Sequence, residues 1–227
     1  MNIKLLATIT PLIVFSLVGC DESIVIDVTT TAIENAVTGS KPSVANASLS
    51  IEMNSKDDCN NQKEKLSTTL SSFFNIKNSE CKDKSYSADI EIPIVLTDSK
   101  GVNNQYKGGM SLQLVAAKDS VNILVAIKKD QLATLRERVK SSFDEAINST
   151  DVKLQFFIKN DGKHSYNFAA SAVYLNGTPI PPFKTASDKF VNNNSNSIVL
   201  SDVAKDSLID GDMPYALIAG LQYVVVK

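Results

Sequence analysis

Residues 45–53 have the sequence ANASLSIEM, in which apolar side chains occupy every second position. This period of two is typical of a strand that buries one face. The same alternation returns in residues 86–96, YSADIEIPIVL. Between the two strands, a helix is predicted with Asp57 or Asp58 as its cap. Its apolar stripe consists of Leu66, Leu70, Phe73 and Phe74.

The region that follows predicts a hairpin and a second amphipathic helix. A polar connection over residues 98–109 precedes two apolar strands, 110–117 and 121–127, which flank a short polar turn. Asp130 is the predicted cap of the helix, whose apolar face consists of Leu132, Leu135, Val139, Phe143 and Ile147. Residues 43–150 are therefore expected to form an α+β domain with an antiparallel sheet and two amphipathic helices.

After residue 150 the sequence changes to short strands and turns. Strands are predicted at 152–158 and 166–175, and Asn176-Gly177 predicts a tight turn. Pro179, Pro181 and Pro182 limit the next segment to an edge or irregular strand. A strand at 198–200, a short helix capped by Ser201 and a strand at 217–226 complete the chain. This spacing favours a small β-sandwich-like domain over residues 151–227.

The first 20 residues indicate export. Lys4 precedes an apolar stretch of about 14 residues, which as a helix would reach about 21 Å, short of a hydrocarbon core about 30 Å thick. Leu17-Val18-Gly19-Cys20 resembles the lipobox of bacterial lipoproteins. The resemblance implies that residues 1–19 are a signal peptide, that Cys20 becomes lipidated, and that the membrane is a partner through this anchor.

The resemblance also bears on the residues after the anchor. In lipoproteins of enterobacteria an acidic residue directly after the cysteine retains the protein at the inner membrane, facing the periplasm, and Asp21 and Glu22 occupy these positions. We expect residues 20–42 to form the lipidated N-terminus and a tether. Alternating Ile24, Ile26 and Val28 also allow a short strand there, followed by one or two helical turns.

Apart from Cys20, the chain has two cysteines, Cys59 and Cys81. An even pair in an oxidising compartment predicts a disulfide, which would stabilise the fold by about 3 kcal/mol for a loop of about 20 residues. The alternatives are a metal site, which would need more ligands than the single histidine His164 provides, and a redox pair, which is typically Cys-x-x-Cys. We expect Cys81 to lie in a polar loop after the first helix.

The sequence does not favour an enzyme, a cofactor or a nucleic-acid partner. The formal net charge of −2 lacks the basic excess that nucleic acids require, and the charged helix face that bears Arg136 and Arg138 is interpreted as solvated. His164 lies in a predicted polar turn, where an exposed residue is expected instead of a catalytic base. A Ser-x-x-Lys match at residues 79–82, together with Lys184-Thr185-Ala186, is attributed to chance. An acidic group is interpreted as a solvated helix and its exit turn and not as a calcium site; it consists of Asp202, Asp206, Asp210 and Asp212.

Three further segments are similar to uncharacterised lipoproteins carried by proteobacterial phages and plasmids: residues 158–160, 173–177 and 200–204. This similarity implies a two-part lipoprotein and carries no site residues. We therefore expect a membrane-anchored, non-enzymatic protein that interacts with another envelope protein, for example to exclude a second phage or plasmid. The alternative is a lipoprotein that binds a small molecule or lipid in a cavity between its helices and a curved sheet. The sequence does not decide the oligomeric state.

Overall fold

The computed structural model describes residues 22–39, 41–97, 106–143, 151–191, 193–211 and 214–222. In these residues it contains four helices: α1 (Thr30–Thr38), α2 (Lys56–Leu70), α3 (Lys129–Phe143) and α4 (Asp202–Ile209). The strands are β1 (Glu22–Thr29), β2 (Ser43–Glu52), β3 (Asn75–Lys82), β4 (Ser85–Thr97), β5 (Met110–Ala116), β6 (Val121–Ile127), β7 (Val152–Lys159), β8 (Tyr166–Ala170), β9 (Val173–Leu175), β10 (Thr178–Ile180), β11 (Ala186–Phe190), β12 (Ser195–Leu200) and β13 (Tyr215–Leu221).

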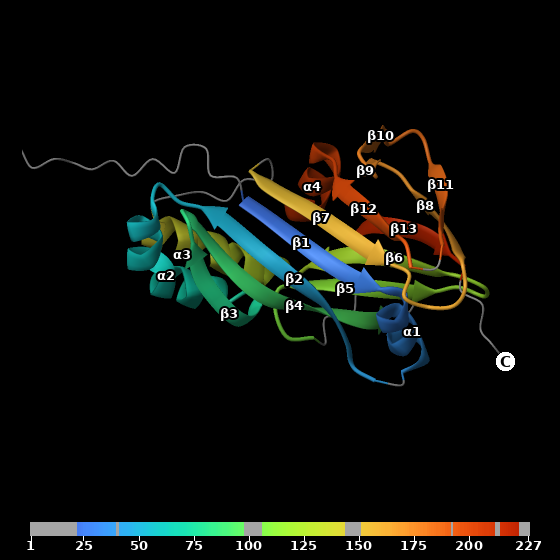
Figure 1. The fold of residues 1–227 in the computed structure, drawn as a ribbon, viewed down its shortest axis with the longest axis horizontal. Helices are drawn as coiled ribbons and strands as arrows, with labels where there is room; N and C mark the ends of the chain where they lie inside the picture. Colours follow the sequence, from blue (N-terminus) through green and yellow to red (C-terminus); the bar gives the residue numbers. More distant parts are fainter. Residues whose placement is uncertain are drawn as a thin grey trace, which may run out of the picture.

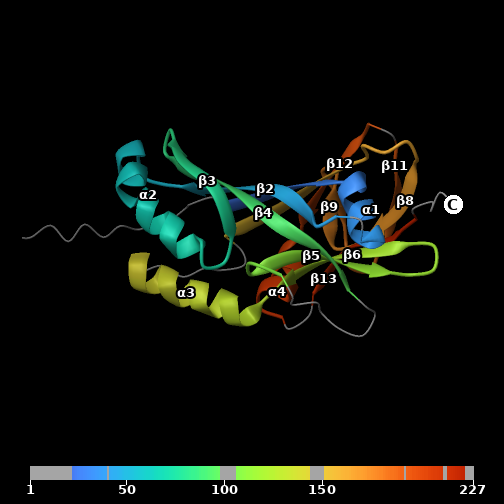
Figure 2. The ribbon, with the colours of Figure 1, turned by 90° about the horizontal axis from the view of Figure 1, so that it is seen from below.

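The strands belong to one continuous sheet that is nearly closed and barrel-like (Figure 1). Its order is β10-β9-β12-β7-β1-β2-β4-β5-β6-β13-β8-β11, and β3 pairs with β4 beside this path. The two terminal strands, β10 and β11, are consecutive in the sequence, which brings the two edges of the sheet back toward each other. Figure 2 shows β2, β3 and β4 on one side and β5, β6 and β13 on the other.

The prediction of an α+β domain followed by a β-sandwich-like domain is wrong. Strand β1 pairs in parallel with β7, with Ile24 opposite Leu154, and β13 pairs with β6. Both ladders join residues before position 150 to residues after it, so no sheet belongs to one half alone. Alternation of apolar residues indicates which face of a strand is buried, but it does not indicate which distant strand lies beside it.

The expected tether is part of the folded body. Residues 22–38 form β1 and α1, which confirms the short strand and helical turns that the alternation of apolar residues allowed. Thr29 caps α1 by accepting a hydrogen bond from the backbone N–H of Ala32 at 3.1 Å, and Gly39 ends the helix with a φ of 64°. Ile33 and Ala36 of α1 are buried against β1, β2, β4 and β5 at one end of the sheet.

A single hydrophobic core fills the space inside the curled sheet. The core draws residues from nearly every element, including α2, α3 and α4. Its largest side chains are almost fully shielded from solvent, at 1 % exposure or less: Tyr86, Tyr166, Phe156 and Phe190. Aromatic and branched side chains therefore fill much of the interior of the sheet.

Helices α2 and α3 lie side by side, and α2 packs against β3 and β4 (Figures 1 and 2). The predicted helices are confirmed, but the end of the first helix and both caps differ. Phe73 and Phe74 of the predicted stripe lie beyond α2, which ends at Leu70, and Ile147 of the second stripe lies outside the described residues. The cap of α2 is Ser55 and not Asp57 or Asp58. The Ser55 hydroxyl accepts a hydrogen bond from the backbone N–H of Asp58 at 3.1 Å. Asp130 lies inside the first turn of α3. Within the part of the chain that the structure describes, none of the helices combines the length and the apolar character needed to cross a bilayer.

The second half of the chain confirms the predicted turns and corrects one strand. Asn176 and Gly177 have φ values of 48° and 82° and join β9 to the edge strand β10, and Ser201 caps α4. The strand predicted at 166–175 is broken at Ala172, whose φ is 54°. Because of this break, β8 pairs with β13 and β11, whereas β9 pairs with β12 and β10.

Candidate functional site

Five strands end or begin together at one end of the sheet, which we call the start rim because β1 begins there. Strand pairing places Glu22 beside Val152 of β7 and Ile51 of β2. The ladder continues from Glu52 to Ser85 and from there to Lys82 of β3. Residues 53–55 then lead directly from β2 into α2, so the helix also begins near this end.

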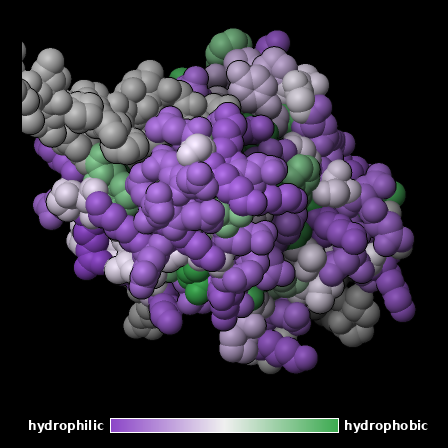
Figure 3. All heavy atoms as spheres, turned by 60° about the vertical axis from the view of Figure 1, so that its left-hand side comes forward, coloured by the Kyte–Doolittle hydropathy of each residue, from purple (hydrophilic) through white to green (hydrophobic). Residues whose placement is uncertain are grey.

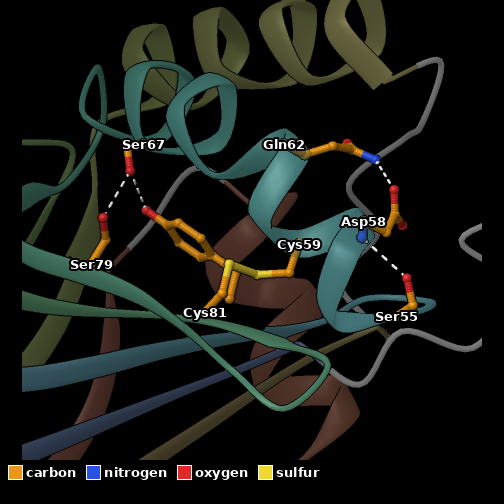
Figure 4. The surroundings of a disulfide bond; sticks show 8 residues. Ser55, Asp58, Cys59, Gln62, Ser67, Ser79 and Cys81 are labelled. Carbon is orange, nitrogen blue, oxygen red and sulfur yellow. Dashed lines mark hydrogen bonds between the residues drawn. A yellow bond between two sulfur atoms is a disulfide. The ribbon is translucent and has the colours of Figure 1, made fainter.

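The predicted disulfide between Cys59 and Cys81 is confirmed and lies close to the start rim (Figure 4). Cys59 lies in the first turns of α2 and is fully buried. Cys81 lies on strand β3 and not in a polar loop, which corrects the prediction. The sequence NIKNSECK has little apolar alternation, and the segment is a strand because it pairs along β4 from Glu91 to Ser85.

A small hydroxyl network continues from the disulfide along α2 and β3 (Figure 4). Ser67 Oγ lies 3.0 Å from Ser79 Oγ and 2.9 Å from the hydroxyl of Tyr86. Ser79 and Lys82 are three positions apart on one strand and therefore face opposite sides of the sheet. The Ser-x-x-Lys match does not place the lysine beside the serine, which agrees with its interpretation as chance.

The opposite end of the sheet, which we call the α1 end, is organised by the side chain of Asn160. This residue is fully buried between the end of β7 and α1. Its Oδ1 accepts hydrogen bonds from the Thr30 hydroxyl and from Gly162 N, both at 3.1 Å. Its Nδ2 donates to the backbone carbonyls of His164 at 2.6 Å and Phe190 at 3.1 Å. All donors and acceptors of the amide are occupied, so its chemistry is that of a structural connector.

Asp161 joins the same end of the sheet to the first turn of α1. Its Oδ1 accepts from the Thr31 backbone N–H at 2.9 Å and lies 3.0 Å from the Thr30 hydroxyl. Partial burial raises the pKa of this carboxyl, but the hydrogen bonds from Thr31 and Thr30 outweigh burial and hold the pKa below its ordinary value. A carboxylate at a helix N-terminus also interacts favourably with the helix dipole.

Tyr166 and Glu34 form a second link between β8 and α1. The phenol donates a hydrogen bond to the Glu34 carboxylate, and burial together with this bond raises the pKa of Tyr166 well above its ordinary value. The tyrosine therefore remains a neutral donor. His164 is exposed, as predicted, and its contact with the network is through its backbone carbonyl.

Charged residues elsewhere form ion pairs, and one of the paired cations, Lys205 of α4, is itself buried. Asp202 pairs with Lys205 at 2.9 Å, and Asp210 pairs with Arg136 of α3 at 2.7 Å. Asp212 of the acidic group lies outside the described residues. Across the described ranges, no cluster of three or more His, Cys, Asp or Glu side chains has a metal-binding arrangement.

A few large apolar side chains are exposed, and two of them belong to the β9–β10 edge. Tyr174 is 44 % exposed on β9, where it pairs with Pro179 of β10. Phe183 is 84 % exposed in the connection between β10 and β11. These two side chains place exposed apolar area near one edge of the sheet.

The structure includes only part of the predicted site. Cys20 and Asp21 lie outside the described residues, whereas Glu22 is the first residue of β1. The hydrogen-bonding role of Asn160 was not predicted. The signal for it was the sequence Asn160-Asp161-Gly162, which indicates a turn whose side chains bond to nearby backbone, but the partner Thr30 is 130 residues away.

Comparison with known proteins identifies a family and no described activity. No curated protein and no solved structure matches the chain. One family model, described as "Domain of unknown function (DUF7424)", matches residues 23–220, and of the helices and strands described above only Glu22 of β1 and Leu221 of β13 lie outside it. The match begins one residue after the first residue of β1. The chain therefore belongs to the DUF7424 family.

Proposed function

We propose that this protein is a lipoprotein, anchored through Cys20 to the periplasmic face of the inner membrane, whose body binds another envelope protein without catalysing a reaction. The observation that carries the interaction role is the filled interior. Phe156, Tyr166 and Phe190 are buried in the single hydrophobic core at 1 % exposure or less. A body with this interior offers its outer surface for recognition.

Two observations support the anchored, exported location. Leu17-Val18-Gly19-Cys20 has the order of a lipobox, and the remaining two cysteines form a disulfide, which is typical of proteins in oxidising compartments. The lipid on Cys20 would give durable attachment because it carries more than one acyl chain. Asp21 would supply the signal for retention at the inner membrane.

The filled core also weighs against the alternative of an internal small-molecule or lipid site. In that alternative, α2 and α3 cover a cavity beneath a curved sheet. Here Leu66 and Leu70 of α2 and Leu132 and Leu135 of α3 belong to the same buried cluster as the strands. The exposed side chains of Tyr174 and Phe183 instead provide apolar contact area outside the core.

Metabolic labelling with a palmitate analogue tests the anchor. We expect label and membrane attachment for the wild-type chain and loss of both for Cys20→Ser, whereas a Cys59→Ala/Cys81→Ala variant keeps the label. Asp21→Ser should shift the labelled protein from inner-membrane to outer-membrane fractions. Unchanged labelling and attachment of Cys20→Ser would disprove the lipoprotein assignment.

Infection and conjugation assays test the interaction role. Cells that express the protein are expected to exclude a second phage or a conjugating plasmid, and Phe183→Ser should weaken exclusion while leaving labelling intact. Val203→Ser, which removes another exposed apolar side chain, from α4, is the matched control. If the wild-type protein changes neither infection nor conjugation, and chemical crosslinking in cells joins it to no phage, conjugation or envelope protein, the interaction role is wrong.

A further inference from the structure

We infer that the start rim lies directly against the lipid headgroups and that the α1 end points away from the membrane. This inference rests on the proposed lipidation of Cys20. It follows from the position of Glu22, which is already paired on both sides within the sheet, with Ile51 and Val152. The chain therefore leaves almost no free length between the anchor and the folded body.

The chain between Cys20 and Glu22 is about as long as the headgroup layer is thick. Two residues of extended chain reach at most about 7 Å, whatever conformation Asp21 adopts. The headgroup region of one leaflet is about 5–7 Å thick. With Cys20 at the membrane interface, Glu22 must lie within or just above the headgroups. A flexible tether over the expected 20–42 would instead have allowed a mean separation of about 26 Å.

The start rim suits a hydrated headgroup surface and does not suit insertion into hydrocarbon. Figure 3 brings forward the side of the molecule where α2 lies, and this face is mostly hydrophilic with small, separate hydrophobic spots. Lys84 pairs with Glu52, and Lys56 is followed by Asp57. Because these charges are mixed, contact with the membrane would depend on the short anchor and little on the charge of the lipids.

The polar side chains on the outer face of the sheet disfavour an orientation in which this face lies flat on the membrane. The exposed side chains there include Asp27 of β1, Ser48 of β2 and Asp89 of β4. Ser48 lies opposite Val25 on one side and Asp89 on the other, in the middle of this face. A polar face of this kind gains nothing from contact with hydrocarbon.

An upright body places the α1 end far from the lipids. Seven residue steps along β1, from Glu22 to Thr29, cover about 23 Å. Thr29 pairs with Lys159, so the loop that bears Lys163 and His164 lies at this far end with α1 (Figure 1). This end would face partners that approach through the periplasm.

Fluorescence quenching in reconstituted vesicles tests this orientation. With Cys20 lipidated and Cys59 bonded to Cys81, an introduced cysteine is the only free thiol. One probe is attached to Asn54→Cys at the start rim, Ser48→Cys on the outer sheet face or Lys163→Cys at the α1 end, all exposed positions. The quencher is a nitroxide on the headgroups of phosphatidylcholine vesicles, with and without phosphatidylglycerol.

We expect the probe at residue 54 to be quenched several-fold more strongly than those at residues 48 and 163, in both lipid compositions. A flexible spacer of about 20 residues between Asp21 and Glu22 should remove this difference, since it allows a mean reach of about 25 Å. Equal quenching at all three positions of the lipidated protein would overturn the orientation alone. Absence of acyl mass and of vesicle binding would overturn the proposed anchor instead.

Discussion

The Thr30 hydroxyl lies 3.1 Å from Oδ1 of Asn160, a residue 130 positions later in the chain. Thr30 is the first residue of α1, and Asn160 directly follows β7, so this contact fastens the helix to the strand beside β1. Both residues are buried, at 1 % and 0 % exposure. A buried polar contact of this kind is stabilising only while every partner remains paired.

Asn160→Ala is expected to lower the free energy of unfolding by about 3 kcal/mol, because unpaired buried polar groups cost about 1–3 kcal/mol each. The substitution would leave the Phe190 carbonyl and the Thr30 hydroxyl without this partner. Urea unfolding followed by circular dichroism measures the change. Ser165→Ala, an exposed substitution in the same loop, should stay within about 0.5 kcal/mol of wild type. Equal stability of the two variants would show that Asn160 has no connecting role.

The lowered pKa of Asp161 leads us to expect that the protein loses stability in acid. The pKa of Asp161 in the folded protein is below the ordinary value of 3.8, so the folded state binds this proton less tightly than the unfolded state. The contribution to stability is therefore complete above pH 3.8 and declines as the pH falls through the lower folded pKa. Asp161→Asn keeps the acceptor oxygen without the charge. The stability difference between wild type and this variant should shrink in urea titrations below pH 3.8; a constant difference would contradict the prediction.

The disulfide predicts sensitivity to reduction. Its cysteines are separated by 22 positions, and the chain-entropy model gives about 3 kcal/mol for a loop of this size. In a Cys20→Ser background, reduction should lower the urea midpoint of the protein. The Cys59→Ala/Cys81→Ala variant should unfold at a low midpoint with or without reductant. A wild-type midpoint that reductant does not move, with free thiols measured, would show that the bond contributes little.

Local sequence patterns predicted most strands and the helices α2, α3 and α4, and they allowed α1 as an alternative to a tether, but they did not predict how the strands are ordered. Alternation at Ile24, Ile26 and Val28 indicates a strand with one buried face, and β1 has this form. Its neighbour β7 is more than 120 residues away, and apolar periodicity contains no information about pairing over such a distance. The sequence analysis did not predict strand β3. Its own residues lack apolar alternation, and it is a strand because it pairs with β4. The disulfide was predictable because the two cysteines had no competing partner.

Gly109 is expected to tolerate no side chain. It lies directly before β5, and its backbone N–H donates to the carbonyl of Phe73 at 2.6 Å, while its own carbonyl accepts from Lys128 N at 2.7 Å. A Cβ at this position would overlap the ring of Phe73, which is 3 % exposed and packs edge-on against Phe74.

Since the backbone is held on both sides of Gly109, relief must come from displacement of the ring, and overpacking of this kind costs about 1–3 kcal/mol. Gly109→Ala should lower the unfolding free energy by this amount. In a Phe73→Leu background the same substitution should cost less, because the smaller side chain leaves room for the new Cβ; the reference is Phe73→Leu alone, since truncation of a buried ring is itself destabilising. Gly177→Ala is the control. At this position the φ of 82° strains an alanine backbone, but no atom lies within 4 Å of the new Cβ. Phe73→Leu should give no rescue there, and equal rescue of both glycine variants would refute the steric explanation.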